Sequence, residues 1–157
     1  MEIPAKQRLR LALYQPDMPQ NTGAMMRLAA CFGVALDIIE PCGFPWDEQK
    51  LKRTGLDYIQ HANYTRHQDW QAFQATRQKR RLVLLTTKSN QPYYSFDFRP
   101  DDILMVGRES AGVPEAIHQS VDAAITVPMQ KDTRSLNVGM AAAIVLSEAL
   151  RQTQSFP

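Results

Sequence analysis

Five short runs of apolar residues, many of them branched, are spaced along the chain and limit its fold more than any other feature of the sequence. They are 9–14 (LRLALY), 35–40 (ALDIIE), 81–87 (RLVLLTT), 102–107 (DILMVG) and 123–129 (AAITVPM). Several are apolar without alternation, which predicts strands buried on both faces, as in a parallel sheet.

The segments between these runs have helical character. Residues 21–33 (NTGAMMRLAACFG) offer Asn21 as an N-cap and Gly33 as a C-terminal stop, and Asp69 is a plausible cap for the helix that follows it. Strands that alternate with helices predict an α/β fold, a mostly parallel sheet flanked by helices, in which ligands bind at the carboxyl ends of the strands. With 157 residues, the chain is expected to form a single domain spanning 1–157.

Composition excludes several classes of protein. The hydrophobic fraction of 44% is ordinary for a globular domain, and no apolar stretch approaches the length of a signal peptide or a membrane span, so we expect a cytoplasmic protein. Cys31 and Cys42 form no disulfide framework and are expected to be reduced. The net charge of +2 permits nucleic acid as a partner without demanding it. Two basic runs, 50–53 and 77–81, could follow a phosphate backbone or could be solvated faces.

The common nucleotide and metal motifs are missing from the sequence. Neither Gly-x-Gly-x-x-Gly nor the P-loop pattern occurs, which disfavours a Rossmann dehydrogenase or a P-loop NTPase. His61, His67 and His118 lack the spacing of zinc ligands, so we interpret them as surface or packing residues and expect no metal.

Three polar clusters remain, each at the end of a predicted strand or the start of a helix. Residues 19–27 (PQNTGAMMR) contain Asn21 and Arg27. Residues 106–114 (VGRESAGVP) hold two glycines five positions apart, with Pro114 suited to the first turn of a helix. Residues 127–137 (VPMQKDTRSLN) lead into the last helix, for which Ser135 is a fair N-cap. That helix is apolar nearly all round over 138–146, which favours a second copy of the chain as its cover.

In this order, the three clusters resemble motifs one, two and three of the SPOUT class of RNA methyltransferases. Within the class, the segment PDMPQNTGAMMRLAACFG and its continuation through GLDY are similar to the small tRNA (cytidine/uridine-2'-O-)-methyltransferases that modify the wobble nucleotide of leucine tRNAs. The resemblance covers nearly the whole chain, from about residue 9 to about residue 150, and so implies a single SPOUT domain with no appended RNA-binding domain. It also implies a C-terminal deep trefoil knot, a homodimer, S-adenosylmethionine as methyl donor and tRNA, in particular leucine isoacceptors, as substrate.

The resemblance also implies roles for individual residues. Cofactor contacts are expected from Leu85, Gly107, Val127, Ser135 and Leu136. Of the expected catalytic residues, Arg27 would bind the phosphate beside the target ribose and stabilise charge developing on the 2'-oxygen, because a guanidinium is effectively never deprotonated. Asn21 would orient Arg27 or the RNA, Asn137 would orient the ribose, and Ser135 would lie beside the methyl donor. Glu109 is expected to hold Arg108 or Arg134 in place.

Two other functions stay open at this point. The same motifs serve 2'-O-methylation at other tRNA positions or in ribosomal RNA. A knotted domain could also bind RNA or S-adenosylmethionine without turnover, although such a module has no need for Arg27, Ser135 and Asn137 together.

Overall fold

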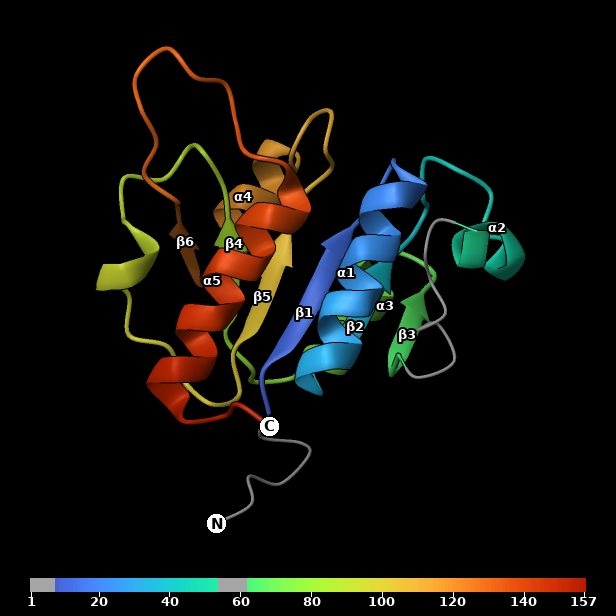
Figure 1. Cartoon of the computed structure of the whole chain (residues 1–157), viewed down its shortest axis with the longest axis horizontal. Coiled ribbons are helices and arrows are strands. Elements are labelled where there is room, and N and C mark those ends of the chain that lie inside the picture. Colours follow the sequence, from blue (N-terminus) through green and yellow to red (C-terminus); the bar gives the residue numbers. More distant parts are fainter. Residues whose placement is uncertain (1–7, 54–61) are drawn as a thin grey trace.

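A six-stranded, fully parallel sheet with helices on both faces forms the body of the protein (Figure 1). The computed structural model describes residues 8–53 and 62–157. The strands lie in the order β3-β2-β1-β5-β4-β6. In chain order the elements are β1 (Arg10–Tyr14), α1 (Pro19–Phe32), β2 (Ala35–Ile39), α2 (Glu48–Arg53), β3 (Tyr64–His67), α3 (Trp70–Arg77), β4 (Leu82–Leu85), the 3-10 turn η2 (Tyr93–Ser95), β5 (Ile103–Val106), α4 (Glu115–Ser120), β6 (Ala123–Ile125) and α5 (Val138–Thr153).

Each face of the sheet carries its own apolar layer. Leu11 and Leu13 of β1 point to the side covered by α1 and α5, whereas Ala12 and Tyr14 point to the side where Phe73 of α3 packs. Figure 1 shows α1 and α5 side by side on the near face of the sheet, and α3 and α4 behind it. The prediction of a parallel sheet buried on both faces is therefore confirmed.

All of the predicted strands occur, and one strand was missed. β3 reads Tyr-Thr-Arg-His, and Thr65 and Arg66 are exposed because the strand forms an edge of the sheet. Such a strand lacks the apolar run that marks the buried ones. Two predicted helix ends are confirmed. Gly33 ends α1 in the left-handed conformation, with φ 66°, and Asp69 caps α3 by accepting from the amide of Ala72.

Three helix starts differ from the predictions. α1 begins at Pro19, because proline favours the first position of a helix, and Met18 is its N-cap. Asn21 therefore lies inside the first turn and is not the cap. The N-cap of α5 is Asn137, two residues after the predicted Ser135. Pro114 is the N-cap residue of α4 and precedes its first turn.

The interpretation of the histidines as surface or packing residues is confirmed for His67, and His118 on α4 is half-buried. His67 is a packing residue: its Nε2 lies 2.8 Å from Asp37 Oδ1, and its ring meets Phe73 edge-on. Arg10 approaches the same carboxylate with two nitrogens, at 2.8 and 2.9 Å. Both cysteines are free. His61 lies outside the described residues.

The two basic runs differ in their surroundings. In the run 77–81, Arg77 pairs with Asp122, Arg80 donates to the carbonyl of Asp101, and Arg81 pairs with Asp102. These contacts tie the run to the amino ends of the strands. In contrast, Lys50, Lys52 and Arg53 are exposed on α2, which follows the carboxyl end of β2.

Candidate active site

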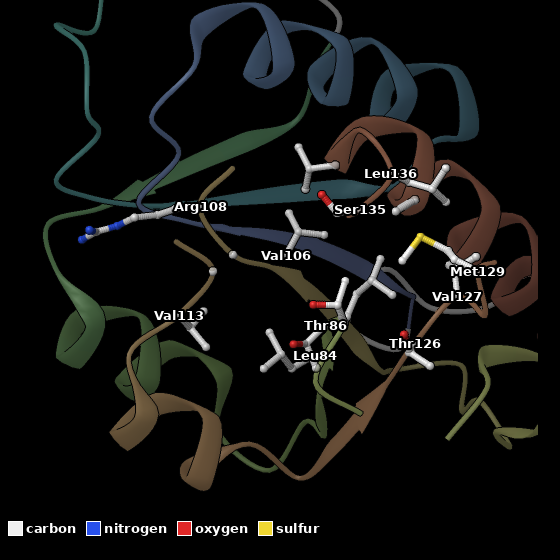
Figure 2. A pocket seen from close by; sticks show the side chains of 16 residues that line it. Leu84, Thr86, Val106, Arg108, Val113, Thr126, Val127, Met129, Ser135 and Leu136 are labelled. Carbon is white, nitrogen blue, oxygen red and sulfur yellow. The ribbon is translucent and has the colours of Figure 1, made fainter. Parts of the chain in front are cut away.

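One pocket opens at the carboxyl ends of β4, β5 and β6, where the sequence predicted a ligand (Figure 2). Its walls come from the ends of β4 and β5, the loops after β4, β5 and β6, and the first turn of α5. The lining residues are Leu84, Leu85, Thr86, Thr87, Val106, Gly107, Arg108, Gly112, Val113, Thr126, Val127, Met129, Ser135, Leu136, Val138 and Ala141.

The pocket contains every residue that the sequence predicted as a cofactor contact. Leu85 ends β4, Gly107 follows β5, and Val127, Ser135 and Leu136 lie in the loop between β6 and α5; the fold brings all five to one hollow. Most of the side chains around them are apolar, and threonine and serine hydroxyls are the main polar side-chain groups. Such a pocket suits a ligand with an apolar or aromatic part that is held mostly by backbone groups.

The loop after β5 is closed by a pair of backbone hydrogen bonds. The amide of Arg108 donates to the carbonyl of Gly112 at 3.0 Å, and the amide of Gly112 donates back at 2.9 Å. A Cβ at Gly107 would lie 2.6 Å from the carbonyl carbon of Gly112, so only glycine fits there. Gly112 itself has φ 63°, which glycine adopts without strain.

The loop after β6 is fixed by the segment that follows β4. The amide of Thr126 donates to the carbonyl of Gln91 at 2.9 Å, and the amide of Tyr93 donates to the carbonyl of Thr126 at 2.8 Å. Ser89 Oγ donates to the carbonyl of Ala124 at 2.7 Å. These bonds hold the start of the loop that later presents Ser135 to the pocket.

Asn137 joins the amino ends of α5 and α1. Its Oδ1 accepts from the amides of Gly139 and Met140, at 2.9 and 3.2 Å, and so caps α5. Its Nδ2 donates to Asn21 Oδ1 at 3.0 Å. The structure therefore brings Asn21 and Asn137 into contact.

Arg27 lies apart from this contact and outside the pocket lining. It is six residues beyond Asn21 on α1, about 9 Å along the helix axis, and its side chain is exposed. It shares a helix face with Ala24, whose Cβ would lie 3.9 Å from a Cβ at Gly139 of α5. Arg27 thus borders the surface where α1 and α5 meet.

Asp17 is a feature of the site that sequence reasoning missed. Its amide donates to Glu109 Oε2 at 3.2 Å, and its Oδ2 accepts from the hydroxyl of Ser110. The expected partners of Glu109 were Arg108 or Arg134, and the structure corrects this, because Arg108 lies over the ring of Tyr14 instead. The position of Asp17 after β1, at the same edge as the pocket, was the signal available in the sequence.

The electrostatics of Asp17 and Glu109 are linked. Burial, followed by the hydrogen bond with Asp17, raises the pKa of Glu109 above the ordinary carboxyl value. The hydrogen bond with Glu109 lowers the pKa of Asp17, and the bond from Ser110 adds to this. The two carboxyls therefore behave as a pair in which Glu109 holds a proton more readily.

We expect Asn137→Ala to lower the free energy of unfolding by about 1 to 2 kcal/mol, because this substitution removes the cap of α5. Asn137→Asp keeps an oxygen for the cap but removes the donor to Asn21, so it should cost less. Urea denaturation measures both. In a double-mutant cycle, Asn21→Ala and Asn137→Asp should be non-additive by about 0.5 kcal/mol or more. Strict additivity would show that the hydrogen bond between Asn21 and Asn137 does not form in solution.

The described residues offer neither a metal site nor a membrane-spanning helix. Within 8–53 and 62–157, no three His, Cys, Asp or Glu side chains are grouped so that they could hold a metal ion. In the same part of the chain, no helix has the length and apolar character needed to cross a membrane.

Comparison with known proteins agrees with this geometry. The chain is 58% identical over 144 residues to the tRNA (cytidine(34)-2'-O)-methyltransferase of Beijerinckia indica, covering 90% of each chain. It is 42% identical over 146 residues to the enzyme of the same name from Escherichia coli K12, covering 92% of this chain and 93% of the other.

Two solved structures give the same result. One, from work on 2-OH methylation of C/U34 on tRNA, superposes with a TM-score of 0.86 at 37% identity, covering 92% of this chain and 90% of the other. The SpoU methyltransferase AviRb of Streptomyces viridochromogenes, in complex with AdoMet, has a TM-score of 0.80 at 25% identity, covering 94% of this chain and 61% of the other. The model of the SpoU rRNA Methylase family matches residues 8–147. The chain therefore belongs to the SpoU methylase family, within the SPOUT class that its three motifs resemble.

Proposed function

We propose that this protein transfers a methyl group from S-adenosylmethionine to the ribose 2'-hydroxyl of the wobble nucleotide, cytidine or modified uridine, in leucine tRNAs. The observation that carries the proposal is the convergence of Leu85, Gly107, Val127, Ser135 and Leu136 on one pocket. Relatives that match nine-tenths of the chain are named for 2'-O-methylation of nucleotide 34 in tRNA. We place the reaction in the cytoplasm, where tRNA is available, and assign it to the whole chain as one domain.

The pocket fits the methyl donor. S-adenosylmethionine carries a methyl group activated on a sulfonium, so the chemistry needs positioning and a route for one proton but no metal. The close approach of Gly107 to Gly112 lets backbone groups border the ligand, and most of the side chains in the walls are apolar. This is how a nucleotide-like cofactor binds without a Gly-x-Gly fingerprint.

The acceptor ribose lies on the side of the pocket where α1 and α5 begin. Ser135 borders the donor, and Asn137 and Asn21 are already joined by a hydrogen bond. Arg27 binds the adjacent phosphate and stabilises negative charge on the 2'-oxygen, while that phosphate or a water takes the proton. The tight 107–112 loop on one side of the pocket and the capped start of α5 on the other hold the methyl donor and the ribose in line for transfer.

A second copy of the chain completes the site. Met140 and Ile144 lie on one face of α5 and are 64% and 38% exposed, and Leu136 and Met129 nearby are exposed as well. This apolar surface borders the face of α1 that carries Arg27, so a dimer formed through α5 places Arg27 at the subunit boundary. We include the deep trefoil knot in the proposal, with the loop between β6 and α5 threaded through another loop. Gly107 after β5 and Ser135 before α5 both line the pocket, which agrees with such an arrangement.

The dimer is tested by Ile144→Glu. A charge placed in a packed apolar interface costs several kcal/mol, so the variant should be monomeric at concentrations where the wild type is dimeric. Light scattering measures the mass. Ala116→Glu, which adds the same charge at an exposed position of α4 on the other face of the sheet, is the control and should stay dimeric. A wild type that is monomeric at micromolar concentration with full activity would rule the dimer out.

The two basic runs should contribute unequally to RNA binding. The paired change Lys50→Glu and Lys52→Glu removes exposed charge at the pocket edge of the sheet, so tRNA affinity should fall. The slope of log affinity against log salt should become shallower by about one for each phosphate that the variant no longer neutralises. Lys79→Glu, in the run at the other end of the strands, is the control and should leave affinity and slope unchanged. An equal effect from Lys79→Glu would contradict this assignment.

The function is tested with purified protein, labelled S-adenosylmethionine and tRNA from cells that lack this protein. We expect label at the 2'-oxygen of nucleotide 34 in leucine tRNAs, and activity that survives EDTA. Label at another tRNA position, or in ribosomal RNA supplied in the same assay, would replace the wobble assignment. Binding of the cofactor without transfer to any RNA would identify a binding module.

A further inference from the structure

Two carboxyl groups from different loops meet beside the pocket. Asp17 lies between β1 and α1, and Glu109 lies in the loop after β5 that includes Gly107. Oδ1 of Asp17 and Oε1 of Glu109 are buried, and neither accepts a hydrogen bond from a donor in the described part of the chain. Two buried acceptors without donors are costly, and two ionised carboxylates in contact repel each other.

The surroundings of the two carboxyls, as far as the structure describes them, supply no cation that resolves this conflict. The loop between β2 and α2 covers Asp17 with Gly43, whose amide donates to the carbonyl of Pro16 at 2.9 Å and which presents no titratable group. On its own loop, Glu109 is flanked by Arg108, which lies over the ring of Tyr14, and by Ser110, whose hydroxyl binds the other oxygen of Asp17. The charged group that acts most strongly on Glu109 is therefore Asp17 itself.

A single proton held by the pair would relieve both problems, because a carboxylic acid donates where a carboxylate only accepts. We propose that Asp17 and Glu109 share one proton, and that the pair positions the start of α1 against the 107–112 loop of the pocket. α1 carries Asn21 and Arg27, so the shared proton connects the acceptor side of the site to the donor side. Asp17 and Glu109 are positioning residues in this arrangement, and only that role depends on the proposed function.

The direction of each titration agrees with the shared proton. The pKa of Glu109 is raised by burial and by Asp17, so its contribution to stability is present below the unfolded pKa and is lost as pH rises through the folded one. The pKa of Asp17 is lowered by the hydrogen bond with Glu109, so its contribution is lost as pH falls through the folded pKa. The pair is therefore most effective between the two titrations, and above the upper titration its two charges push the loops apart.

The first experiment detects the proton without any assay of activity. The side-chain carboxyl carbons of Glu109 and Asp17 are followed by NMR through a pH titration of the wild-type protein. We expect two linked steps, one above and one below the ordinary carboxyl range. In Glu109→Gln we expect a single Asp17 step that stays below this range, because the introduced amide and the hydroxyl of Ser110 still donate to it, and no upper step. Independent titration of the two groups in the ordinary range would overturn the proposal, whether or not the protein methylates tRNA.

The second experiment tests positioning. Glu109→Gln keeps a donor to Asp17 at every pH, so the ratio of wild-type to Glu109→Gln activity should fall about tenfold as pH rises through the upper titration. Glu109→Ala, which has no donor, should be less active than Glu109→Gln at every pH. Glu115→Gln removes a charge from exposed α4 and should keep the wild-type profile. A ratio that does not change with pH, or Glu109→Gln as inactive as Glu109→Ala, would refute the positioning role.

Discussion

Replacing Arg27 by alanine is expected to lower the turnover of tRNA methylation by about a hundredfold or more, the scale of removing one donor that stabilises an oxyanion. Binding of S-adenosylmethionine should be nearly unchanged, because Arg27 lies on α1 outside the pocket lining. Single-turnover assays with saturating cofactor measure the first quantity, and calorimetry with the cofactor alone measures the second.

The Arg27→Lys variant distinguishes between two roles for Arg27, that of a fixed cation and that of a general base. Lysine keeps the charge but loses the planar fork that binds phosphate, so this variant should be more active than Arg27→Ala and less active than the wild type. A fixed cation adds no titration near neutrality, so any basic limb in the pH profile should stay at the same pH in Arg27→Lys. If Arg27→Ala instead abolishes cofactor binding while RNA affinity holds, Arg27 belongs to the donor pocket and the proposed role is wrong.

The strands and the pocket were predictable for different reasons. β4 and β5 are buried on both faces, so their apolar runs are continuous and easy to recognise. β3 carries exposed Thr65 and Arg66 at the sheet edge, and its position is set by pairing with β2, which the local sequence does not encode. The pocket residues were found through resemblance, because backbone groups of Gly107 and Val127 leave no fingerprint in side-chain chemistry.

The helix caps show what local sequence preferences cannot predict. Ser135 and Asn137 are both good capping residues, and propensity alone does not choose between them. The structure uses Asn137, which has an oxygen for α5 and an amide left over for Asn21. A hydroxyl would not span both partners in this way. The contact between Asp17 and Glu109 was out of reach for a similar reason, because it joins loops 92 residues apart in the sequence.

Gly107→Ala is expected to abolish cofactor binding at concentrations that saturate the wild type. The added Cβ would lie 2.6, 2.7 and 2.9 Å from the carbonyl carbon, Cα and carbonyl oxygen of Gly112. All three are backbone atoms, which cannot move aside as the end of a flexible side chain would, so the 107–112 loop must shift. Such a shift breaks the paired hydrogen bonds between Arg108 and Gly112 and moves two pocket walls at once.

Gly112→Ala is the matched control for this prediction. A Cβ at Gly112 meets no atom within 4 Å, so the substitution adds only the strain of a left-handed residue with φ 63°. That strain is about 1 to 2 kcal/mol, which corresponds to about a tenfold loss when it falls on the binding-competent loop. Calorimetric titration with S-adenosylmethionine should therefore rank the wild type first, Gly112→Ala second and Gly107→Ala last, with circular dichroism showing that both variants are folded. If the two alanine variants bind the cofactor equally well, the close approach of Gly107 to Gly112 does not shape the pocket.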